Sequence, residues 1–142
     1  MRCLGNTAYC NSFTAGEMLA LGCDRVLVEV LNGDDIMNSP GIVFTALATL
    51  SNLCYGESTQ SHIGSAEGVV DTAIRILDYG LHTLVVGEAA MLLLATMWKN
   101  LGNKILVAGK NAIPVLVKRI ISHSEISDEE NMDCLEKCCA GT

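Results

Sequence analysis

The chain has 142 residues and a formal net charge of −7, and half of its residues are hydrophobic although only 4% are aromatic. Its nine basic residues are scattered, and a protein that binds duplex nucleic acid needs a stripe of Lys and Arg, so no nucleic-acid partner is expected. The most hydrophobic stretch, Leu84 to Trp98, is too short to span a bilayer and contains a charged residue, so no membrane partner is expected either.

Apolar periodicity, interrupted by glycine and by capping residues, predicts helices in a repeated short, medium and long order. Their predicted bounds, in chain order, are Arg2–Cys10 (the tail of a long helix), Thr14–Leu21, Asp24–Leu31, Pro40–Tyr55, Ser61–Ala66, Gly68–Asp78, Leu84–Asn100, Asn103–Ala108, Ala112–Ser122 and Asp128–Cys139.

Start and stop signals support these bounds. Ser39 followed by Pro40 is typical of a helix start. Capping boxes, in which Ser or Thr precedes Glu by three residues, are predicted to open two further helices at Thr14 and Ser127. Three helices are predicted to end at glycines in the left-handed conformation, namely Gly22, Gly80 and Gly109.

The helices repeat at a nearly constant spacing. Segments Cys23–Asn32, Gly68–Leu77 and Ala112–Ile121 align without gaps, with starts 45 and 44 residues apart. The long helices share a leucine, at Leu4, Leu50, Leu94 and Leu135. Such a period indicates a helical solenoid, in which each unit contacts its neighbours and the stack presents an extended surface. We therefore predict one domain over 1–142, with a partial repeat over 1–10 and repeats over about 11–55, 56–100 and 101–142.

Two repeated stretches resemble armadillo sequences. Ala108-Gly109 followed by AIPVLV at 112–117 resembles the signature A-G-(A)-I-P-x-L-V, and ALATLSNLC at 46–54 resembles the third-helix stretch A-L-x-x-L-S-N-L-A. The resemblance covers the whole chain and implies an all-α fold, a right-handed α-solenoid of three-helix repeats. HEAT repeats, with two helices each, are the alternative fold, whereas a 34-residue tetratricopeptide unit does not fit the period.

The resemblance also implies a way of binding. In importin-type armadillo proteins an asparagine on the third helix holds the main chain of an extended peptide, because an amide offers both a donor and an acceptor. The matching positions here are Asn6, Asn52, Thr96 and Lys137. The tryptophans of that type would lie four residues earlier, at positions occupied here by Arg2, Ala48, Leu92 and Asp133. Binding of nuclear-import signals is therefore not expected.

The expected function is a non-enzymatic module that holds a protein or an extended peptide, basic or apolar, along the groove of its third helices. The candidate partner-binding residues are Asn6, Asn52, Thr96, Tyr9, Tyr55 and Lys99. A packing role for the two tyrosines is the alternative. The other function considered is a structural element of a large cytoskeletal or ciliary assembly that makes contacts through its apolar ends. Because the chain starts and ends inside long helices, we expect a fragment of a longer array, or ends that self-associate.

Residues that could carry chemistry form no recognisable site. Cys134, Cys138 and Cys139 raise a zinc hypothesis, but a second cysteine pair is lacking and free thiols are the favoured interpretation. No catalytic residue, metal or cofactor is expected. Seven cysteines without a disulfide framework favour a reducing compartment, the cytoplasm or the nucleus. Glu88 is expected to be exposed in the first turn of its helix, and Trp98 is expected to pack.

Overall fold

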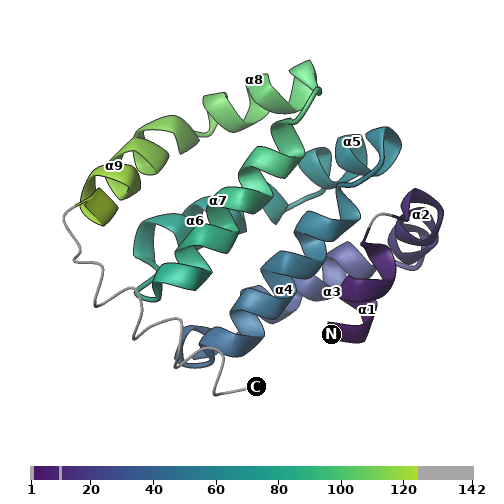
Figure 1. Ribbon diagram of the computed structural model, residues 1–142, viewed down its shortest axis with the longest axis horizontal. Helices are drawn as coiled ribbons and strands as arrows, with labels where there is room; N and C mark the ends of the chain where they lie inside the picture. The colour runs from purple at the N-terminus through teal and green to yellow at the C-terminus, as the bar shows by residue number, and fades with distance from the viewer. Residues whose placement is uncertain (1, 10, 125–142) are drawn as a thin grey trace.

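The computed structural model describes residues 2–9 and 11–124 (Figure 1). These residues form nine α-helices and one short 3₁₀ helix, and no β-strand occurs among them. The predicted all-α class is therefore confirmed. The helix predicted over Asp128–Cys139 lies outside the described residues. Within the described ranges, no helix is both long enough and apolar enough to cross a membrane.

The helices follow one another in the predicted order. Their bounds are α1 Arg2–Ala8, α2 Ser12–Ala20, α3 Cys23–Leu31, the 3₁₀ helix η1 Ile36–Asn38, α4 Pro40–Leu53, α5 Glu57–Ser65, α6 Val69–Tyr79, α7 Thr83–Met97, α8 Leu101–Gly109 and α9 Ala112–Ser124. The helices α2 and α3 nevertheless have the same length of nine residues.

Helices that are three positions apart in the chain contact each other. The long helices form one row, in which α1 contacts α4 and α4 contacts α7 (Figure 1). The short helices α2, α5 and α8 form a second row, and the medium helices α3, α6 and α9 form a third. In addition, α3 contacts α4 and α6 contacts α7, so each medium helix contacts the long helix that follows it.

The short helices begin two to four residues earlier than predicted, because other residues cap them. Asn11, not Thr14, is the N-cap of α2, and its side chain accepts a hydrogen bond from the Thr14 N–H at 3.0 Å. Asn100 caps α8 in the same way, accepting from the Asn103 N–H at 2.9 Å. The capping box predicted at Thr14 is therefore wrong, whereas the predicted start of α4 at Pro40 is confirmed.

A residue in the left-handed conformation precedes each medium helix. Gly22 and Gly68 have φ values of 79° and 80°, and Asn111 has a φ of 64°. Glycine and, less readily, asparagine tolerate this conformation because the steric penalty on Cβ is absent or offset. The prediction for Gly22 is confirmed. Those for Gly80 and Gly109 are wrong, because Gly80 has a φ of −64° and Gly109 is still helical.

The core is built from aliphatic side chains at helical spacing. On α4 the buried apolar residues are Val43, Ala46, Leu47, Leu50 and Leu53. The corresponding stripe on α7 packs among α4, α5, α6 and α8. One side of α7 nevertheless remains exposed and carries Met91, Leu94 and Trp98. Four neighbouring helices therefore cover only part of the surface of α7 within the described residues.

Candidate interaction surface

The register between α4 and α7 decides which side chains of the two long helices are equivalent. The helices begin 43 residues apart, at Pro40 and Thr83, whereas the sequence alignment pairs Leu50 with Leu94. Burial supports the structural register, because Leu50 is 1% exposed and Leu93 0%, whereas Leu94 is 51% exposed. The alignment is therefore shifted by one residue along α7.

This shift changes the position of Thr96. In the structural register, Thr96 is the counterpart of the buried Leu53, and its hydroxyl donates to Leu93 O at 2.8 Å. A fully buried side chain cannot contact a partner, so Thr96 does not belong to a binding surface in this structure. The counterpart of Asn52 is Ala95, which has no amide to offer.

Asn52 makes a contact between two long helices. Its Nδ2 donates to Gly5 O of α1 at 3.0 Å, and the side chain is half-buried. Gly5 itself lies close to α4, since a Cβ at this position would be 2.9 Å from Thr49 Oγ1. One of the two N–H donors of the Asn52 amide is thus used within the chain, where it fixes α4 to α1.

The other candidate residues lie at the surface. Asn6 is exposed on α1, Tyr9 directly follows the same helix, and Tyr55 and Lys99 lie two residues beyond the ends of α4 and α7. Lys99 has a φ of 57° and marks the turn into α8. All four side chains are accessible and lie on or just beyond long helices.

Sequence reasoning missed Trp98. The residue is the C-cap of α7 and is 68% exposed over the described residues, so the expectation that it packs is wrong. In the structural register Trp98 is the counterpart of Tyr55. One exposed aromatic residue therefore lies at the end of each long helix in the described ranges. We call these three residues, Tyr9, Tyr55 and Trp98, the aromatic row. Trp98 and Tyr55 become equivalent when α4 and α7 are aligned by their first residues, which are 43 positions apart.

A shallow, open depression lies next to the aromatic row, where the short helices begin. It is lined by Ser12, Gly56, Glu57, Ser58, Ser61 and Asn100, and its surface combines polar and apolar atoms in nearly equal parts. Gly56 directly follows Tyr55, and Asn100 lies two residues after Trp98. Residues with hydroxyl, amide and carboxylate groups thus follow the aromatic residues closely in the chain, and such groups can hydrogen-bond a peptide main chain.

Buried polar contacts hold the end of α7 that carries Trp98. Asn103 of α8 donates from Nδ2 to Thr96 O at 2.8 Å and to Gln60 O at 3.0 Å, and Gln60 Nε2 donates to Ala95 O at 2.6 Å. Thr96 O lies in the last turn of α7, where carbonyls lack partners within the helix, so Asn103 supplies its donor. Ala95 O accepts from the Trp98 N–H at 3.4 Å as well as from Gln60. We call the Asn103 and Gln60 contacts the polar lock.

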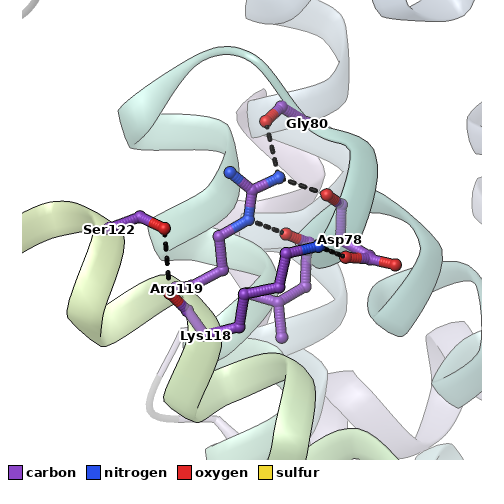
Figure 2. A network of polar contacts seen from close by, with 6 residues as sticks. Asp78, Gly80, Lys118, Arg119 and Ser122 are labelled. Carbon is purple, nitrogen blue, oxygen red and sulfur yellow. Dashed lines mark hydrogen bonds and ion pairs between the residues drawn. The ribbon is translucent and has the colours of Figure 1, made fainter.

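Arginines join the medium helices in a similar way. Arg75 of α6 donates to Leu31 O at the end of α3, at 2.7 Å. Arg119 of α9 donates from Nε to Leu77 O at 2.5 Å, and from Nη2 to the carbonyls of Asp78 and Gly80 (Figure 2). Each guanidinium thus lies at the negative end of the medium helix in the preceding unit, where a cation is stabilising.

Three ionisable groups in the described ranges have environments that raise their pKa, namely Cys23, Cys54 and Glu88, and burial is the main cause for each. Burial raises the pKa of the Cys54 thiol to about 12. Burial also raises the pKa of Glu88, and the hydroxyl of Ser51 on α4 opposes that shift. Ser51 Oγ is buried and forms no hydrogen bond of ordinary geometry within the described residues, so we regard burial as the deciding effect. Glu88 is half-buried in the second turn of α7, and its expected exposure in the first turn is wrong.

A polar side-chain contact joins α5 to α3. His62 Nε2 of α5 lies 3.2 Å from Asp24 Oδ2 of α3, and the Asp24 side chain is buried while that of His62 is half exposed. Over the described ranges, His, Cys, Asp and Glu side chains form no group of three that could hold a metal ion. The cysteines of the zinc hypothesis, Cys134, Cys138 and Cys139, lie outside those ranges.

Comparisons of the chain with protein-family models, with curated proteins and with solved structures give no match.

Proposed function

We propose that this protein is an armadillo-like α-solenoid and a non-enzymatic module that holds an extended partner segment along its long helices. The observation that supports it best is the regular placement of one exposed aromatic side chain at the end of α1, α4 and α7. Aromatic residues are enriched in protein interfaces because they bury a large area at a small cost in conformational entropy.

The repetition of internal contacts supports the architecture. Helices three positions apart contact each other in all three rows, and Arg75 and Arg119 make matching contacts one unit apart. A chain built of such units gains stability from contacts between neighbours, and stacking them produces an elongated surface. The cysteine content, together with this architecture, suits a protein of the cytoplasm or nucleus.

The proposed partner is a segment of protein with apolar and basic residues. The net charge of −7 favours a cationic partner over an acidic one. The aromatic row can receive apolar or lysine side chains, and the depression next to it can hydrogen-bond the main chain. In this proposal Asn6 and Lys99 lie at the edges of the bound segment.

A phage-displayed library of random dodecapeptides tests the proposal, with the wild-type chain as bait. Selected peptides are expected to bind the variants Tyr9→Ala and Trp98→Ala at least about thirtyfold more weakly, which corresponds to the roughly 2 kcal/mol of an interface hot spot. The matched control is Tyr79→Ala, which removes an equally exposed tyrosine at the end of α6, outside the row. Equal loss in Tyr79→Ala, or no loss in either row variant, would contradict the proposal.

The second candidate function is a scaffold element that makes contacts through its end. Exposed apolar side chains on the last described helices favour it, in particular Leu94, Ile105 and Ile120. Such a protein is expected to self-associate, so its melting temperature should rise with protein concentration. A melting temperature independent of concentration, together with monomeric light scattering, would contradict this function.

A further inference from the structure

The charges of the chain are unevenly distributed along its length. Residues 2–88 contain ten acidic and three basic residues, whereas residues 89–124 contain five basic residues and no acidic one. The net charge of −7 therefore conceals a change of sign between the first units and the last described one. A segment that extends along all three long helices passes from one sign of charge to the other.

The same change of sign occurs at the ends of the long helices, next to the residues of the aromatic row. Glu57 lies two residues after Tyr55, at the first position of α5, and among the described residues that line the depression it is the one with a charge. Lys99 directly follows Trp98, in the turn between α7 and α8. Both side chains are exposed, and both charges suit their helices, because anions are stabilised at the start of a helix and cations at its end.

These two charges are available to a partner. The ion pairs that the described residues form involve other side chains, so neither Glu57 nor Lys99 is neutralised by them. By contrast, Lys118 of α9 already pairs with Asp78 at 2.6 Å. A partner of opposite charge can therefore meet Glu57 or Lys99 without first breaking an ion pair inside the chain.

The separation of the two charges sets the length of segment between them. Tyr55 and Trp98 are equivalent residues of two long helices that contact each other, and packed helices lie about 8–10 Å apart. An extended segment advances about 3.3 Å per residue, so about three of its residues cover that distance. A side chain that reaches Glu57 is therefore about three positions away from one that reaches Lys99.

We propose that the partner segment carries both signs of charge, with a lysine or arginine at Glu57 and an aspartate or glutamate at Lys99. The inference rests on the proposed function and defines its partner more narrowly. The ring of Tyr55 favours a cation at the first position as well, because the face of an aromatic ring attracts cations. The two charges fix the register and direction of the segment, which hydrogen bonds to a repeating main chain leave open.

Peptide selection with charge-reversed baits tests the proposal. The full-length wild-type chain and the variants Glu57→Lys and Lys99→Glu each select from the library of random dodecapeptides. The matched controls are Glu67→Lys and Lys104→Glu, which reverse exposed charges outside the aromatic row. Peptides selected by the wild type are expected to combine a basic residue with an acidic one two to four positions away. This pair should occur at least about threefold more often than in the unselected library, because an exposed ion pair raises affinity by up to about fivefold.

Peptides with a reversed charge give the sharper comparison. Replacement of the acidic residue of a selected peptide by lysine is expected to weaken binding to the wild type, and to strengthen binding to Lys99→Glu, at least about threefold each. Replacement of the basic residue by glutamate should act in the same way on Glu57→Lys. Such a gain of affinity cannot result from a loss of folding. The two control baits should keep the preference of the wild type.

The outcomes separate this proposal from the proposed function. Selected peptides that depend on Tyr9 and Trp98 but lack the pair of charges, or that bind charge-reversed and control baits alike, would overturn the proposal and leave the proposed function in place. A wild-type chain that selects no peptide, or peptides that do not depend on the aromatic row, would overturn both.

Discussion

Arg119 of α9 donates from Nε to the carbonyl of Leu77, in the last turn of α6, across a gap of 42 residues in the chain. The same guanidinium reaches the carbonyls of Asp78 and Gly80, so one side chain satisfies three carbonyls at the end of a helix (Figure 2). Those carbonyls lack partners within α6 and carry its negative dipole end. The contact therefore fixes the last described unit to the one before it.

Substitution of Arg119 should weaken the fold measurably. We expect Arg119→Met to lower the free energy of unfolding by about 1.5–3 kcal/mol, the usual value for hydrogen bonds from a charged group, because the carbonyls of α6 lose their donor. Urea denaturation followed by circular dichroism measures the change. Arg75→Met, which removes the equivalent contact to Leu31 O, should cost a similar amount.

Lys118→Met is the matched control for Arg119→Met. Lys118 is the neighbouring cation on α9 and pairs with Asp78 at 2.6 Å, but its side chain is largely exposed. Exposed ion pairs contribute less than about 1 kcal/mol to the free energy of unfolding, so Lys118→Met should cost less than that. A cost for Lys118→Met equal to that of Arg119→Met would show that charge alone, and not the bonds to carbonyl groups, accounts for the effect.

Gly64 of α5 should not tolerate a methyl group. A Cβ at this position would lie 2.1 Å from Asn103 Nδ2, and Asn103 is buried and held by the polar lock. We expect Gly64→Ala to lower the free energy of unfolding by about 1–3 kcal/mol, because either the amide must shift or its bonds must break. The measurement is the denaturation midpoint.

Gly87→Ala is the control for this effect, because a Cβ at position 87 of α7 would meet no atom within 4 Å. Alanine has a higher helix propensity than glycine, so Gly87→Ala should raise the free energy of unfolding by roughly 0.5–1 kcal/mol. A stabilising Gly64→Ala would mean that α5 and α8 can separate at no cost, contrary to the close packing in the structure.

The local parts of the fold could be predicted from the sequence. Apolar spacing and the period between Cys23–Asn32 and Gly68–Leu77 identify every described α-helix, and Ser39-Pro40 places the start of α4 correctly. These signals are local in the chain, since a helix start or an apolar stripe depends on residues within a few turns. The 3₁₀ helix η1 is not predicted. Helix starts at Asn11 and Asn100 were missed because several polar residues near each start can act as caps.

The candidate surface was predicted less well, because it depends on the register between helices. Leucines occur at both 93 and 94, and a sequence alignment cannot tell which one faces the core. That choice moves Thr96 into the interior and brings Trp98 level with Tyr55. The contacts of Arg119 and Asn103 also join residues about 40 positions apart, and no local pattern indicates them.

Cys54 should be far less reactive than Cys3. Burial raises the pKa of the Cys54 thiol to about 12, so at pH 8 only about one molecule in ten thousand carries the thiolate, the reactive form. Cys3 is exposed. Brief treatment of the native protein with iodoacetamide, followed by tryptic tandem mass spectrometry, distinguishes the two sites. Peptide 26–75 contains Cys54 alone, and fragmentation of peptide 3–25 separates Cys3 from Cys10 and Cys23. Unfolding in urea should remove the difference. Equal labelling of both cysteines in the native state would show that α4 opens readily.

Glu88 should make the stability depend on pH in a way that Glu88→Gln does not. Burial raises the pKa of the folded carboxyl above its ordinary value of 4.5, so the folded state binds the proton more tightly than the unfolded state does. The contribution of the protonated carboxyl to the free energy of unfolding is fully present below pH 4.5. It is lost as the pH rises through the folded pKa, and above that pKa the free energy no longer changes through this group. Glu88→Gln should therefore equal the wild type near pH 4 and exceed it at pH 7, by less than about 1 kcal/mol because the side chain is half exposed. Urea midpoints of both proteins across this range give the difference, in which all other titrations cancel. A variant that is less stable than the wild type at pH 7 would show that the Glu88 charge is stabilised by its surroundings, against the effect of burial.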